Sequence, residues 1–360
     1  MSQSPRGHFE FIRIEDPAHV PPRNDRAIEV AVLDMNHLWP NMGHDALVEL
    51  VRETANYFLP FLTSAGIDIR VLSYEVRDRQ MIPEGPSRFS LYIGTGGPGH
   101  LDPAMNDGVS PWSQGIRESP SWEAPLFELF DAIRDEPSAS LLGVCHTFGV
   151  LCRWAGIATA AFRSPAKGGK SSGVHENVLT PDAVDHPWFR RFSRELPDGR
   201  RFRVIDNRLF DMIPASRFPA GIIPLAREVN PQGRGEGEAL TMVEMARDRD
   251  GVMPRILASN HHPEVIDREH SLRILADKFR RGEVSSEWYE ERARTLTEQF
   301  EGEDIETALR LTSQYTLLLP LQFQMARLIR LRREELGLGG NFHEDQLVRD
   351  FADAEEEVPV

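Results

Sequence analysis

The order of apolar segments along the chain predicts an α/β protein with an open, mostly parallel sheet that is flanked by helices and followed by a helical C-terminal extension. Three observations carry this prediction. Buried-strand runs alternate with helical segments in the first half, glycine-rich or nucleophile-bearing turns follow two of the strands, and helical periodicity replaces strand patterns after Asp267.

The first half starts with a buried-strand run at 27–35, AIEVAVLDM, followed by apolar residues at near-helical spacing. Two further strand runs come next, then a Pro/Gly/Ser-rich loop at 98–121, a helical stretch and a short buried strand, SLLGV. A second helical pattern begins directly after that strand. This order favours consecutive parallel strands joined by crossovers.

The second half reads as short strands joined by turns between Val174 and Glu264, which would complete the sheet and add an antiparallel layer. Beyond Asp267 the pattern is helical. Its clearest stripe is apolar, with Pro320 as an acceptable helix start and Gly337 as a stop: Leu321, Met325, Leu328 and Ile329.

Four regions follow from these patterns. They are a flexible, polar N-terminal arm at 1–26, an α/β domain at 27–280, a helical extension at 281–340 and an acidic tail at 341–360.

Composition excludes several classes of protein. The formal net charge of −15 would repel a phosphate backbone, so we expect no nucleic-acid partner. No apolar stretch approaches the roughly 20 residues of a membrane span. We therefore expect no membrane partner. The two cysteines, Cys145 and Cys152, lie in one predicted segment and build no disulfide framework, which points to a reducing compartment, so we expect a cytoplasmic protein.

The run GGKSS at 168–172 invites a phosphate-loop interpretation, which the surrounding sequence does not support. The required first glycine would fall at Ser164, and no strand immediately precedes it. We therefore expect neither a nucleotide nor any other cofactor, and no metal.

Cys145 ends the strand run SLLGV and precedes a helical pattern, the layout of a nucleophile elbow. Such a turn exposes the side chain, and a helix N-terminus favours the reactive thiolate. The alternative is that Cys145 is a small buried hydrophobic residue, as unpaired cysteines often are.

His262, Pro263 and Glu264 provide a possible base and its carboxylate. Residues i and i+2 of an extended chain point the same way, so Glu264 could orient the His262 imidazole. The third motif is the glycine-rich run at 93–99, whose N–H groups could approach a developing oxyanion. An ordinary turn is the alternative there.

In order and spacing, these three motifs resemble the class I glutamine amidotransferase family, across about 28–279 of the chain. The resemblance implies a flavodoxin-like architecture and a Cys145, His262 and Glu264 triad that works through a thioester. It also implies an oxyanion hole made by the N–H groups of Gly97 and His146. The substrate-binding positions would be Gly96, Gly99, Thr147 and Gly149.

The chain departs from the family at two positions. Thr147 and Gly149 stand where the family usually has glycine and glutamine, so this chain is a divergent member and glutamine is in doubt as its substrate. Transfer of an acyl group is an alternative, because homoserine acyltransferases share the fold. A silent protein that binds a metabolite or partner in the same cleft is another. The pair Cys145-His146 also resembles the intracellular-protease-like group, where the HPE motif is not expected.

The resemblance suggests a small amide or acyl substrate and, because this chain shows no nucleotide signature, a separate synthase subunit. The helices after residue 280 are a candidate homodimer surface, with packing against their own domain as the alternative.

Overall fold

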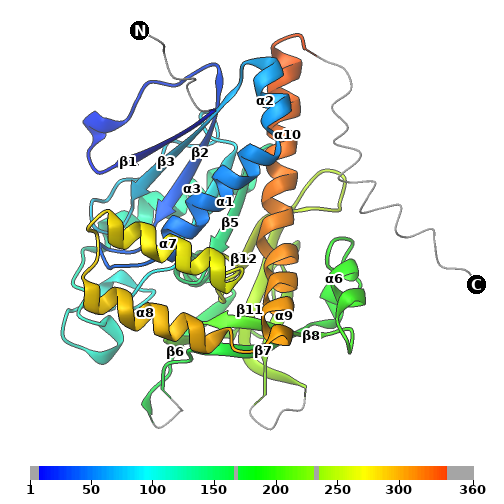
Figure 1. Ribbon diagram of the computed structural model, residues 1–360. Coiled ribbons are helices and arrows are strands. Elements are labelled where there is room, and N and C mark those ends of the chain that lie inside the picture. The colour runs from blue at the N-terminus through cyan, green and yellow to red at the C-terminus, as the bar shows by residue number, and fades with distance from the viewer. Residues whose placement is uncertain (1–7, 166–168, 231–234, 339–360) are drawn as a thin grey trace, which may run out of the picture.

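The computed structural model describes residues 8–165, 169–230 and 235–338. Within these ranges twelve strands form one sheet, shown in Figure 1. Its first six strands, in spatial order, are parallel: β1 (Phe9–Ile14), β3 (Asp68–Glu75), β2 (Ala27–Asp34), β4 (Leu91–Gly94), β5 (Ser140–Val144) and β12 (Pro254–Ser259). The predicted open parallel sheet is therefore confirmed.

The sheet continues beyond β12 as antiparallel strands, which matches the expected antiparallel layer. These strands are β11 (Glu236–Arg247), β10 (Ile223–Val229), β7 (Gly173–Leu179) and β8 (Arg201–Asp206), with β9 (Phe210–Pro214) pairing β11 and β6 (Ala158–Phe162) pairing β9. The change of direction occurs at β12, the strand that leads to His262.

Helices cover both faces of the sheet, because successive strand residues point to opposite sides. On β2, Val30 and Val32 enter one core and Ala31 and Leu33 the other. The first core is covered by α1 (Gly43–Tyr57), α2 (Leu59–Ala65), α5 (Pro181–Val184), α6 (Phe189–Glu195) and α10 (Leu319–Glu335). The second is covered by α3 (Glu123–Asp135) and α4 (His146–Trp154).

The expected N-terminal arm differs from the structure. Residues 1–7 lie outside the described residues, but β1 is an edge strand that pairs in parallel with β3 from Phe9 to Ile14. In its sequence FEFIRI, Phe9 and Phe11 lie on one face and Ile12 and Ile14 on the other, so the apolar residues do not alternate regularly with polar ones. The polar composition of the segment around it hid this short strand.

The helical extension packs against its own domain. It comprises α8 (Ser286–Gln299), α9 (Glu303–Ser313), a π-helical segment (Gln314–Leu318) and α10, preceded by α7 (Arg268–Arg280). The apolar stripe of α10, including Leu321 and Met325, is buried in the core shared with α1 and β2. The intramolecular alternative therefore holds for this stripe, which is the long orange helix of Figure 1.

One contact joins α7 to α1, and a second joins α8 to the ends of the sheet strands. The Lys278 ammonium on α7 donates to the Asp45 carboxylate on α1 at 2.7 Å. Leu296 and Phe300, at the end of α8, share a small buried cluster with Ile205 and Val265. These contacts place α8 beside the turns that follow β8 and β12. The expected acidic tail lies outside the described residues. No described helix is both long and apolar enough to cross a membrane.

Candidate active site

Cys145 occupies a strained turn between β5 and α4. Its φ of 50° and ψ of −99° lie in a region that costs a non-glycine residue about 1–3 kcal/mol. The turn is held in place because the Cys145 N–H donates to the Ser259 carbonyl at 2.7 Å, and the Cys145 carbonyl accepts the first helical bond of α4 from Gly149. Cys145 is half-buried, whereas Cys152, near the C-terminal end of α4, is fully buried.

His262 and Glu264 pair as the HPE motif predicts. Nδ1 of His262 lies 2.7 Å from Oε1 of Glu264, and Glu264 is 1% exposed. Burial alone would lower the pKa of His262, but the Glu264 carboxylate and the Cys145 thiolate outweigh it, so the pKa is raised well above its usual value. The ring is thus stabilised as an imidazolium next to the sulfur.

Gly43, the first residue of α1, explains how Glu264 fits there. A Cβ at Gly43 would lie 2.7 Å from Oε1 of Glu264. Glycine therefore leaves room for the carboxylate at the N-terminus of a 15-residue helix, where negative charge is favoured.

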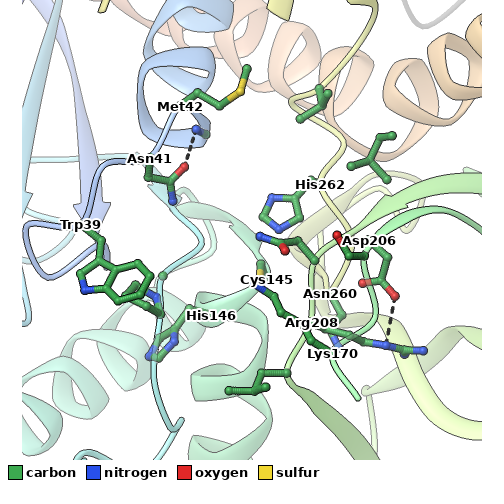
Figure 2. A pocket seen from close by; sticks show the side chains of 18 of the residues that line it. Trp39, Asn41, Met42, Cys145, His146, Lys170, Asp206, Arg208, Asn260 and His262 are labelled. Atoms are coloured by element: carbon green, nitrogen blue, oxygen red, sulfur yellow. Dashed lines mark hydrogen bonds and ion pairs between the residues drawn. The ribbon is translucent and has the colours of Figure 1, made fainter. Parts of the chain in front are cut away.

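Cys145 and His262 meet at Gly96. A Cβ built on Gly96 would lie 3.2 Å from Cε1 of His262 and 3.8 Å from Sγ of Cys145. Nε2 of His262 has no hydrogen-bond partner within the described residues, so this nitrogen remains available for proton transfer. Figure 2 shows the His262 ring directly above Cys145 in the cleft.

The 95–99 loop lies in the same cleft. Gly97 and Gly99 line it together with Cys145, His146 and His262. No acceptor among the described residues takes the N–H of Gly97 or that of His146, the first residue of α4. Gly97 must be glycine, since a Cβ there would lie 2.1 Å from the Met35 carbonyl oxygen.

Arg77, which the sequence patterns did not single out, holds this loop. Its guanidinium donates to the carbonyls of Met35 and Pro98 at 2.9 and 2.6 Å and forms a fork with the Glu118 carboxylate. Both side chains of the ion pair are almost fully buried. The buried Arg77–Glu118 ion pair therefore holds the loop in place through the Pro98 carbonyl.

Thr147 and Gly149 do not line the cleft, although the family resemblance assigned them to substrate binding. The Thr147 hydroxyl donates to the Thr95 carbonyl at 2.8 Å, and its side chain occupies the space above Gly94. A Cβ at Gly149 would lie 2.4 Å from Cδ1 of Leu101. Leu101 therefore fills the place into which a longer side chain at 149 would extend.

The histidines beside the motifs are buried and neutral. Burial lowers the pKa of His261 to about 3 and moves the pKa of His146 well below its usual value. His261 packs edge-on against Phe202, and neither of its ring nitrogens has a partner among the described residues. His261 is structural, and the His146 ring lines the cleft as a neutral group.

The other side of the cleft comes from segments that sequence reasoning missed. Its lining side chains include Lys170, which follows β6, Asp206 at the end of β8, Arg208 just after that strand, and Trp288 and Arg292 on α8. The sequence signals were the run GGKSS at 168–172, which was set aside as a phosphate loop, and the four-residue spacing of Trp288 and Arg292 on one helical face. Among the described residues no group of three or more His, Cys, Asp or Glu side chains is arranged to hold a metal ion.

The chain has structural relatives of low similarity. They include a glutamine amidotransferase from Thermotoga maritima (TM-score 0.45, 14% identity, covering 84% of this chain and 98% of that one). A second is a putative GMP synthase subunit from Thermoplasma acidophilum (TM-score 0.38, 14% identity, covering 66% of this chain and 85% of that one). A third is the glutaminase domain of Trypanosoma brucei CTPS with bound acivicin (TM-score 0.39, 10% identity, covering 69% of this chain and 92% of that one).

No family model and no curated protein matches the sequence.

Proposed function

We propose that this chain is a cysteine-nucleophile enzyme that cleaves, or transfers an acyl group from, a carboxamide or acyl substrate through a thioester. The observation that supports it is the strained Cys145 turn beside His262, whose pKa is raised by Glu264 and by the Cys145 thiolate itself. Backbone strain and a perturbed pKa in one cleft are features of functional sites.

The first half-reaction forms the thioester. The Cys145 thiolate attacks the carbonyl carbon, and the developing oxyanion accepts hydrogen bonds from the N–H groups of Gly97 and His146. When the tetrahedral intermediate collapses, the carbon–nitrogen bond of an amide substrate breaks and His262 gives its proton to the departing amine. The acyl group remains on the sulfur.

The second half-reaction releases the acyl group. Neutral His262 takes a proton from water, and the resulting hydroxide attacks the thioester carbon. The carbon–sulfur bond breaks, the acid leaves and the imidazolium–thiolate pair is restored. In a transferase another nucleophile would replace the water, by the same proton transfer.

We infer that free glutamine is a poor substrate. The family's glutamine side chain at position 149 is absent, and Leu101 occupies its place. A lost hydrogen-bonding partner in a buried site costs about 1–3 kcal/mol, or roughly tenfold to over a hundredfold in binding. If ammonia is the product, a separate synthase subunit would consume it.

Alkylation by iodoacetamide, followed by mass spectrometry of the modified peptides, tests the proposal. We expect Cys145 to react at least about tenfold faster than Cys152, and His262→Gln to slow Cys145 selectively. Cys152→Ala is the matched control and should leave the Cys145 rate unchanged. Acivicin, as a glutamine-shaped electrophile, should label Cys145 weakly.

Two results would contradict this assignment. An unreactive Cys145 in the native protein would favour a silent binding protein. Efficient glutamine hydrolysis by the isolated chain would show that the Gly149 position does not limit the substrate.

A further inference from the structure

Two cations line the cleft without forming an ion pair with any residue that the structure describes. Lys170 and Arg292 both line it, and neither makes a hydrogen bond or ion pair with another described residue. The Arg292 guanidinium instead lies over the Trp288 ring, 5.7 Å from its centroid. Arg208, in the same cleft, differs because Asp206 and Glu228 neutralise it. We call Lys170, Trp288 and Arg292 the cationic wall.

The two charges of this wall disfavour each other. The Lys170 side chain is exposed, but the cleft partly desolvates its ammonium and lowers the pKa. The Cys145 sulfur opposes this shift, the Arg292 charge adds to it, and Asp206 opposes it. No anionic side chain among the described residues forms an ion pair with Lys170 or Arg292, so both cations would attract an anionic ligand that enters the cleft. In Figure 2 Cys145 lies between His262 and Lys170, so that ligand would be adjacent to the sulfur.

An independent observation marks the same place as polar and incomplete. Asn260, two residues before His262, lines the cleft and is only 5% exposed. Its Nδ2 group has no acceptor among the described residues. A buried amide donor without a partner costs about 1–3 kcal/mol, which a bound oxygen atom would offset.

We propose that the substrate carries a carboxylate in addition to the acyl carbon that Cys145 attacks, and that Lys170 and Arg292 bind this carboxylate. Asn260 supplies a neutral donor beside them. The inference rests on the proposed function and names the substrate class for that site: the mono-amide or another mono-acyl derivative of a small dicarboxylic acid.

The charges also oppose a neighbouring ammonium group on the substrate. Such a group would meet the two cations, while Asp206 is already paired with Arg208 and accepts from the Ser171 hydroxyl. A free α-amino acid is therefore a poorer fit to this wall than a simple dicarboxylic derivative. The cavity volume of about 180 Å³ suits a molecule of that size.

Iodoacetate and iodoacetamide provide a matched pair of probes, because both alkylate a thiolate and differ mainly in charge. We compare their rate constants at Cys145, normalised to the same ratio for 2-mercaptoethanol. The native protein should show a normalised iodoacetate preference of about fivefold or more at low salt, declining as salt screens the charges. Lys170→Gln and Arg292→Gln should each reduce it severalfold, and the double variant should abolish it.

The control variant is Arg249→Gln, which removes an exposed charge from the turn before β12, at the far end of that strand from His262. It should leave the preference unchanged. The iodoacetamide rate by itself measures the reactivity of the Cys145 thiolate, because this reagent carries no charge. If Cys145 reacts with iodoacetamide but the ratio is the same in all variants, the carboxylate site is disproved while the proposed function stands. If neither reagent reacts, the proposed function fails.

Protection experiments sharpen the substrate class. Glutarate should slow alkylation of Cys145 by iodoacetamide at concentrations where glutamine does not, and the double variant should lose this protection. Stronger protection by glutamine than by glutarate would overturn the inference.

Discussion

The two sides of the cleft are built differently. One side, with Gly97, Cys145 and His262, lies at the carboxyl ends of parallel strands and is fixed by backbone bonds and a buried ion pair. The other side includes the cationic wall, carried by the loop after β6 and by α8, whose cations form no ion pair with another residue that the structure describes. If the proposed reaction takes place, the sheet would fix the geometry at Cys145, and the choice of substrate would depend on surface segments that can vary without disturbing it.

The largest expected effect is on the fixed side. Arg77→Met leaves the Glu118 carboxylate buried without its partner and should lower the free energy of unfolding by about 3–5 kcal/mol. Urea unfolding measures this loss. The matched control is Arg52→Met, which removes the exposed pair with Glu49 and should cost less than about 1 kcal/mol. Equal losses in the two variants would mean that the ion pair does not hold the loop.

The next effect tests whether Leu101 fills the space beside Gly149. Gly149→Gln should destabilise the protein by about 1–3 kcal/mol, because the new side chain meets Leu101. Combined with Leu101→Ala, it should cost less than the sum of the two single changes, as expected of residues in contact. The double variant should also react faster with acivicin than the native protein. Strict additivity in urea unfolding would disprove the contact.

A third effect separates the two adjacent histidines by pH. The pKa of His261 falls from about 6.5 unfolded to about 3 folded, so the unfolded chain binds the proton first and stability is lost as pH falls below 6.5. The loss at pH 5.5 is about 1.4 kcal/mol. His261→Gln should therefore show a smaller drop in unfolding free energy between pH 7.5 and 5.5 than the native protein.

The contribution of His262 to stability changes with pH in the opposite direction. Its folded pKa is raised, so its contribution is fully present below pH 6.5 and is lost as pH rises through the folded value. The stability difference between the native protein and His262→Gln should accordingly shrink with increasing pH. The same trend with pH in both variants would contradict this assignment.

The smallest effect is expected at the cationic wall. Lys170→Gln and Arg292→Gln remove exposed charges that have no partners among the described residues, so each should change the unfolding free energy by less than about 0.5 kcal/mol. A loss above 1 kcal/mol in either variant would show that the side chain supports the fold, and would remove the contrast between the two sides.

The sequence predicted the fixed side well, because its signals are local. The strand before Cys145, the helix after it and the two-residue spacing of His262 and Glu264 all follow from backbone periodicity over a few residues. The edge strand β1 was missed because six residues without regular alternation, inside a polar segment, give a weak signal, and the strand is defined by its pairing with β3.

By itself the sequence determined the order of strands and helices from β2 to α4, the turn at Cys145 and the pairing of His262 with Glu264. Only the tertiary structure decided that Leu101 fills the space beside Gly149, that Arg77 fastens the glycine loop, and that Lys170 and Arg292 lie in the cleft of Cys145. The physical reason is range: periodicity and turn chemistry act between near neighbours, whereas Lys170 and Arg292, 122 positions apart by their numbers, are brought to one cleft by the packing of α8 onto Ile205 and Val265.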